Sequence, residues 1–245
     1  SKELTKKIWG DDLVWCPRQR PGFYLGLQLQ KICKDHPSAR GVLLGGHGVI
    51  NWAESNQECY EWAVEIIQKA DEYLAKHDKG EMTFGGNRYP DLTEASRRST
   101  LVEILPWLRG QVSRDKPLVA TVQDDEMMRY FVNSEDVIRL SELGTSCPDH
   151  FLRTKIKPMS VPWDPHCQSL AQLKELIQQG LAAYRQDYTA YYERCKHADS
   201  PAIRNTNPSI VLIPGLGMIA WGKNKSESRV TAEFYNLSLI HISEP

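Results

Sequence analysis

The sequence lacks the features of several classes of protein. No apolar run reaches the roughly 18 residues of a membrane span, and no secretory apolar segment follows Ser1-Lys2-Glu3-Leu4. The formal net charge is −1, which gives no electrostatic reason to expect binding to nucleic acid or to an anionic membrane. The six cysteines contain no CxxC pair, a usage typical of reduced thiols. We therefore expect a cytoplasmic protein with no nucleic-acid or membrane partner.

Two common signatures of metal enzymes are also missing from the sequence. There is no HExxH motif, and no two histidines are spaced as H-x-H. The chain does not begin with methionine, and it opens directly on a helix-like segment. We interpret it as a fragment of a longer protein.

A glycine run around one histidine occurs twice, and only the first copy contains the histidine. Residues 42–58 and 211–227 are identical at seven of 17 positions, at a constant offset of 169. The first copy contains Gly45-Gly46-His47-Gly48 and the second Pro214-Gly215-Leu216-Gly217. In both copies apolar residues flank the glycines, and a capping residue with a glutamate three positions later follows. The sequence predicts two strand-turn-strand-helix units, the second without the polar group at its tip.

The remaining sequence predicts mainly helices. Changes in composition along the chain divide it into four segments. The polar, glycine-rich residues 78–93 are typical of a linker, and the helix expected after them is broken at Pro106. The last nine residues resemble a translated sequencing adapter, so we expect the final helix to fray near Asn236. The predicted segments are a C-terminal part of a metal-binding domain at 1–77, a linker at 78–93, a second related segment at 94–236 and a non-native, exposed tail at 237–245.

His47 is the candidate metal ligand of this sequence. Glycines on both sides permit tight turn geometry and leave the imidazole free to project from the tip. Neutral imidazole is a good ligand for Zn²⁺. The local sequence alone favours a turn histidine bonded to water or backbone, and the repeat shifts the interpretation towards a functional role. The sequence does not identify further ligands.

A second candidate site is basic, and a third pattern suggests a nucleotide. His150, Arg153 and Lys155 lie close together in the sequence and could contact an anion such as a phosphate or carboxylate, or form a solvated face.

Residues 215–220 match G-x-G-x-x-A, which is found in dinucleotide-binding folds. That fold requires a helix to begin within the glycines, whereas here the helix signal starts only at Asn224. We therefore favour a structural role for these glycines.

Six short motifs follow one another along the chain. They are Ile8-Trp9-Gly10-Asp11, Arg20-Pro21-Gly22-Phe23, Gly45-Gly46-His47-Gly48, Gly144-Thr145-Ser146-Cys147-Pro148-Asp149-His150, Arg153-Thr154-Lys155 and Ile213-Pro214-Gly215-Leu216-Gly217-Met218. This ordered set resembles the class II aldolase/adducin family, and within it the aldolase half of bifunctional rhamnulose-1-phosphate aldolase/short-chain dehydrogenases. The resemblance extends from residue 1 to about residue 236.

This resemblance implies a three-layer α/β/α fold with a degenerate second strand-turn-strand-helix repeat. It also implies a lyase of rhamnose metabolism, in which a divalent metal, usually Zn²⁺, assists cleavage of rhamnulose 1-phosphate to dihydroxyacetone phosphate and lactaldehyde. His47 matches the third metal-binding histidine of the family. The other ligands and the catalytic acid/base residue are expected upstream of Ser1, and NAD would bind only to the absent dehydrogenase half.

The resemblance further implies a homo-oligomer acting on a small phosphorylated ketose. The fragment alone should be inactive. A second hypothesis is a metal-free binding or assembly scaffold, as in adducin-type relatives. An H-x-H pair upstream of Ser1 would favour the lyase.

Overall fold

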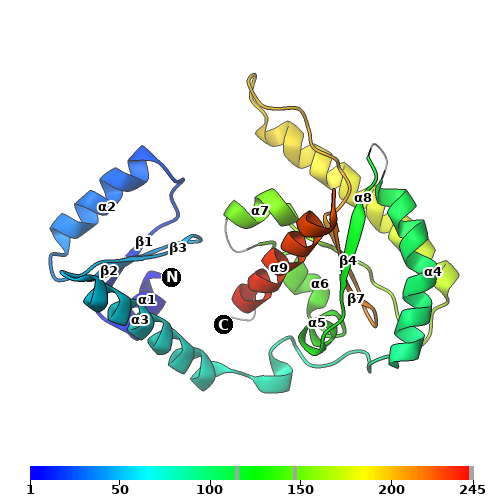
Figure 1. The fold of residues 1–245 in the computed structure, drawn as a ribbon, viewed down its shortest axis with the longest axis horizontal. Coiled ribbons are helices and arrows are strands. Elements are labelled where there is room, and N and C mark those ends of the chain that lie inside the picture. The colour runs from blue at the N-terminus through cyan, green and yellow to red at the C-terminus, as the bar shows by residue number, and fades with distance from the viewer. Residues whose placement is uncertain (114–115, 146–147, 243–245) are drawn as a thin grey trace. The chain divides into compact units, whose positions relative to one another are not determined.

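The structure is a computed structural model that describes residues 1–113, 116–145 and 148–242 (Figure 1). It is a mixed α/β protein with two separate sheets, in agreement with the predicted α/β class. The chain divides into two compact units, the first ending at Lys79 and the second beginning at Gly80. Across the described ranges, no helix is both long and apolar enough to cross a membrane.

The first unit contains a three-stranded sheet and three helices. Strands β1 and β2 are parallel, and β2 and β3 are antiparallel, in the order β1-β2-β3. Trp62 is fully buried beneath α1 and the sheet, and its indole N–H donates to the carbonyl of Arg40 over 3.1 Å. The elements are α1 (Lys2–Trp9), β1 (Leu13–Cys16), α2 (Phe23–Asp35), β2 (Gly41–Leu44), β3 (Gly48–Asn51) and α3 (Asn56–His77).

The second unit contains a four-stranded sheet with the order β4-β7-β6-β5. Only the pair β5 and β6 is parallel; the other neighbours are antiparallel. The elements are the 3-10 turn η1 (Gly80–Met82), α4 (Glu94–Val112), β4 (Val119–Gln123), α5 (Glu126–Val132), α6 (Val137–Ser141), α7 (Pro148–Thr154), β5 (Met159–Ser160), α8 (Leu170–Cys195), β6 (Ile210–Ile213), β7 (Gly217–Gly222) and α9 (Lys225–Ile242).

Helices cover both faces of this second sheet. Successive strand residues point to opposite faces, so β6 contributes Val211 and Ile213 to one core and Ile210 and Leu212 to the other. The first core packs against α4 and α8, and the second against α5, α6 and α9. All four side chains are at most 1% exposed. A central strand buried on both faces explains why β6 is an uninterrupted apolar run.

The two copies of the glycine run form hairpins with the same register. Leu44 pairs with Gly48 in the first unit, and Ile213 pairs with Gly217 in the second. His47 is the tip residue of the first hairpin and Leu216 that of the second. The N–H of each donates over 3.1 Å to the carbonyl of the residue three positions earlier. Each copy therefore forms the strand-turn-strand unit that the repeat predicts.

Both hairpins are followed by a helix with the expected cap. The Ser55 hydroxyl accepts from the N–H of Glu58, and the Glu58 carboxylate accepts from the N–H of Ser55. At α9 the side chain of Asn224 accepts from the N–H of Glu227 over 2.9 Å. Such caps satisfy helix N–H groups that have no partner within the helix.

Two expectations about helices are wrong. Helix α4 is continuous through Pro106, because Ile104 and Leu108 on either side are fully buried and hold both turns against the core. Helix α9 does not fray near Asn236 but continues to Ile242. Leu239, inside the predicted tail 237–245, is only 5% exposed and joins the core beneath α9.

The segment predicted as a linker, residues 78–93, contributes to the second unit. Phe84 is 3% exposed and lies in the same core as α9. Asn87 forms a β-bridge with Ser134, and the N–H groups of Arg88 and Tyr89 donate to the carbonyl of Asn133. The Gly-rich composition thus belongs to an irregular but packed segment.

Candidate functional site

His47 lies at the tip of the hairpin formed by β2 and β3, and its side chain is exposed. Gly46 before it has a φ of 64°, a conformation that side chains with a Cβ rarely adopt. Gly45 is constrained differently, because a Cβ there would lie 2.7 Å from Cζ2 of Trp15. The glycines therefore fix a narrow turn that presents the imidazole to solvent.

The described residues do not form a complete metal site. Within them, no three His, Cys, Asp or Glu side chains are grouped so as to hold a metal ion. A catalytic zinc ion has about three protein ligands. The predicted zinc therefore does not fit these residues alone, and His47 supplies at most one ligand.

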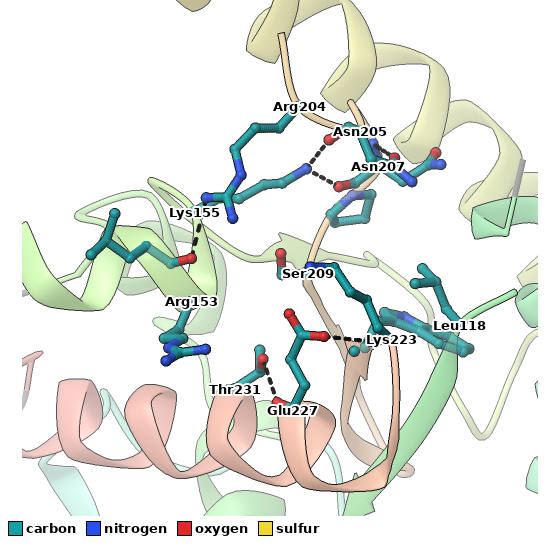
Figure 2. A pocket seen from close by; sticks show the side chains of 14 residues that line it. Leu118, Arg153, Lys155, Arg204, Asn205, Asn207, Ser209, Lys223, Glu227 and Thr231 are labelled. Atoms are coloured by element: carbon teal, nitrogen blue, oxygen red, sulfur yellow. Dashed lines mark hydrogen bonds between the residues drawn. The ribbon is translucent and has the colours of Figure 1, made fainter. Parts of the chain in front are cut away.

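A basic pocket lies in the second unit, and two of the three predicted anion contacts line it (Figure 2). Its volume is about 220 Å³. The four cationic side chains in its lining are Arg153, Lys155, Arg204 and Lys223. Arg153 lies on α7 and Lys155 in the turn after it. Arg204 lies in the segment before β6, and Lys223 in the turn between β7 and α9. We refer to this cavity as the basic pocket.

Lys155 ends helix α7 in a left-handed conformation, with a φ of 62°. Its side chain is only 9% exposed, and Nζ donates to the carbonyls of Asn205 and Asn207. Nζ also lies 4.4 Å from the centroid of the Tyr188 ring. Burial, and secondarily the charge of Arg204, lower the pKa of Lys155 to about 7. This amine is therefore close to half protonated at neutral pH and can take up a proton when an anion approaches.

The carboxylate of Glu227 also lines the basic pocket, and the fold restrains it. One oxygen accepts from the backbone N–H of Lys223 over 2.7 Å at the start of α9. Figure 2 shows Arg204 and Lys155 on one side of the pocket, Glu227 and Thr231 on the opposite side, and Ser209 between them. Arg153 and Lys223 lie on the same side as Glu227 in that view, so the pocket offers positive charge on both sides and one carboxylate acceptor.

His150 does not line the basic pocket, unlike its predicted companions Arg153 and Lys155. It is 8% exposed, and Nδ1 lies 2.9 Å from the hydroxyl of Ser238 on α9. Its ring also meets the Phe234 ring edge-to-face, with centroids 5.2 Å apart. The structure thus places the His150 ring against α9 and apart from the basic pocket, and its contact with an anion stays a prediction.

Sequence reasoning missed most of the basic pocket, including Arg204, Lys223 and Trp221. Arg204 lies in a polar segment with no periodic pattern, and Lys223 stands in a turn. Trp221 has the apolar surroundings of a core residue, and it both packs in the core and lines the pocket. The one available signal was the repeat, which singles out the turn between β7 and α9.

The G-x-G-x-x-A match does not form a dinucleotide-binding turn. Gly217 begins strand β7, which runs to Gly222, and helix α9 begins only at Lys225. The helix that follows the glycines therefore begins three residues after β7 ends, and not within the glycine turn as a bound pyrophosphate would require. This agrees with the structural interpretation of the motif.

Comparison with known proteins gives one family and one informative relative. Residues 99–243 match the family described as "Aldolase class II, second domain". A Bacillus subtilis (strain 168) protein named "Uncharacterized oxidoreductase YuxG" is 34% identical over 238 residues. The aligned part is 97% of this chain but only 34% of that relative, so the chain spans about a third of its length. No solved structure shows a significant match.

Proposed function

Because this chain belongs to the class II aldolase family, we propose that it is part of an aldehyde-lyase that cleaves a phosphorylated ketose. The proposed substrate is rhamnulose 1-phosphate, and the products are dihydroxyacetone phosphate and lactaldehyde. One carbon–carbon bond breaks as the adjacent hydroxyl loses its proton and becomes the aldehyde. The enediolate left behind takes up a proton and becomes dihydroxyacetone phosphate.

The observation that carries this proposal is the exposed position of His47. A histidine on a turn of three glycines is presented without neighbouring side chains that would bury or cover it. The equivalent tip in the second unit has an apolar residue, Leu216, which is fully buried. An imidazole held in this way suits a role toward an external group better than a role in packing.

A divalent metal, with Zn²⁺ the first choice, is part of this proposal. His47 is proposed as one ligand, and the remaining ligands and the acid/base residue are proposed to come from outside the described residues. When bound, such a metal would polarise the ketose oxygen and stabilise the enediolate. The part of this chain that the structure describes contributes a preformed turn that holds the imidazole in position.

We further propose that the protein joins this lyase part to an NAD-dependent dehydrogenase part. The support is the relative's printed name, "Uncharacterized oxidoreductase YuxG", together with its greater length. This chain matches only 34% of that relative, which leaves ample sequence for a second activity.

The test is a product assay on the natural, full-length protein. The purified protein is incubated with rhamnulose 1-phosphate, and dihydroxyacetone phosphate is measured through a coupled reductase. The proposal predicts product formation that a chelator abolishes and that added Zn²⁺ restores. Fructose 1-phosphate, a ketose phosphate of different stereochemistry, serves as the comparison substrate.

Two outcomes of that assay would contradict the proposal in different ways. Absence of product from any ketose phosphate, with the protein folded and loaded with metal, would favour the scaffold hypothesis. Undiminished turnover after complete metal removal would retain a lyase but overturn the metal assignment.

A further inference from the structure

The geometry points to a binding site for a small phosphate monoester in the basic pocket of the second unit. The pocket residues lie wholly within that unit, so the assignment is independent of the role of His47. The relevant side chains are Arg153, Lys155 and Arg204.

The first argument concerns unpaired positive charge. None of the cations of the basic pocket forms an ion pair with a carboxylate in the described parts of the chain. Lys157, two positions beyond Lys155, instead pairs with both Glu142 and Asp187. Collected cations without carboxylate partners repel one another, and a doubly charged phosphate relieves that repulsion.

The second argument concerns burial. Lys155 is 9% exposed, and its Nζ donates to the carbonyls of Asn205 and Asn207, two residues that also line the basic pocket. The cation is therefore held in the wall of the pocket and does not lie on an open, solvated surface.

The third argument limits the size and chemistry of the ligand. Pockets for drug-sized molecules have volumes of about 300–1,000 Å³. The basic pocket, at about 220 Å³, accommodates a phosphate with a few carbon atoms. Glu227 and Ser209, which also line the pocket, suit hydroxyl groups on that short carbon chain. The chemical class is therefore a small hydroxylated phosphate monoester.

Lys155 gives the binding event a proton signature. The charged or titratable groups around it are Arg153, Arg204, Lys223, Glu227 and Tyr188. Because its pKa is lowered to about 7, Lys155 is largely neutral at pH 8. A dianion bound beside it raises that pKa, so binding at pH 8 takes up a proton from the buffer.

The experiment is calorimetric titration of the full-length protein with glycerol 3-phosphate at pH 8 in phosphate-free buffer. We expect stoichiometric binding, no binding of glycerol, and net proton uptake measured in two buffers of different ionisation enthalpy. Arg204→Gln should raise the Kd about tenfold or more, since it removes a charge-assisted hydrogen bond to the phosphate. Arg229→Gln, an exposed arginine on α9 outside the lining, should bind like the wild type.

A second variant keeps the test decisive if Arg204→Gln is poorly folded. Arg153→Gln removes one positive charge from an exposed side chain of the lining, so it should weaken glycerol 3-phosphate binding several-fold with the fold intact. An unchanged Kd in Arg153→Gln or in folded Arg204→Gln would overturn the proposal, as would equal binding of glycerol. These measurements report binding only, so loss of aldol cleavage with intact binding would reject the lyase and leave this site standing.

Discussion

His47 and Leu216 occupy the same position in two hairpins of the same register, yet their environments are opposite. The N–H of each donates over 3.1 Å to the carbonyl of the residue three positions earlier. His47 is exposed, whereas Leu216 is fully buried in the core beside α4 and α8. The fold thus explains why the second copy has an apolar tip: an imidazole there would lose its hydration without gaining a partner.

The first prediction concerns the stability contributed by each tip. Leu216→Ala should lower the free energy of unfolding by about 2–5 kcal/mol, because it opens a cavity in a packed core. His47→Ala should change it by less than about 0.5 kcal/mol, because the side chain is exposed. Urea denaturation followed by circular dichroism measures both. Similar losses in the two variants would show that the two tips are equally buried.

Gly217 supports a prediction about the turn of the second hairpin. Its φ is 100°, and a Cβ there would lie 2.3 Å from the carbonyl oxygen of Gln123. Gly217→Ala should therefore destabilise the protein by more than about 1 kcal/mol. The matched control is Gly110→Ala in α4, where a Cβ meets nothing within 4 Å and helix propensity predicts a gain of about 1 kcal/mol. Equal melting temperatures for the two variants would contradict this account.

Helix α9 supports a prediction about the end of the chain. Leu239 is 5% exposed and Leu237 is 51% exposed, so these neighbours form a natural pair of test and control. Leu239→Ala should cost about 2–5 kcal/mol, and Leu237→Ala much less. Deleting residues 237–245 should lower the melting temperature by several degrees, since about 1 kcal/mol corresponds to roughly 2–4 °C in a chain of this size. An unchanged melting temperature would restore the expectation of an unpacked tail.

Lys155 supports a prediction about pH. Its pKa is about 7 in the folded protein and about 10.4 in an unfolded chain. Between these values the unfolded chain binds a proton that the folded chain lacks, so Lys155 makes the free energy of unfolding rise with pH, by up to about 1.36 kcal/mol per unit. Below pH 7 both states are protonated, and the cost of burying the charge is fully present.

The Lys155→Met variant isolates this effect because all other titrating groups remain. As the pH rises from 7 to 10, the unfolding free energy of the wild type should increase relative to that of Lys155→Met. Urea denaturation in phosphate-free buffer at four pH values measures that difference. A difference that stays constant with pH would contradict the lowered pKa.

Local features of the fold could be predicted from the sequence where the determining interactions are themselves local. The two hairpins follow from glycines at turn positions, and the caps at Ser55 and Asn224 follow from a side chain that bonds three residues ahead. The end of α9 was predicted wrongly although a signal was present. Tyr235 and Leu239 are spaced four apart, as on one face of a helix.

The basic pocket could be predicted only in part, because its walls meet through long-range contacts. Arg153 and Lys155 are close in sequence, so their clustering was visible. Arg204 joins them because Lys155 bonds to carbonyls about fifty residues away, at Asn205 and Asn207. No periodicity in the polar segment before β6 encodes that contact. The position of His150 could not be predicted for the same reason, since its partner Ser238 is 88 residues distant.

The most direct test of the proposed lyase is kcat/KM for rhamnulose 1-phosphate cleavage by full-length His47→Ala, compared with the wild type and with His36→Ala. His36 is an exposed histidine of the same unit at the end of α2, and so controls for loss of a surface imidazole. If His47 binds the catalytic metal, His47→Ala should lose more than about a hundredfold in kcat/KM, which is about 2.7 kcal/mol of transition-state stabilisation. It should also retain less zinc, while His36→Ala behaves like the wild type. Turnover and zinc content equal to wild type in folded His47→Ala would contradict the account.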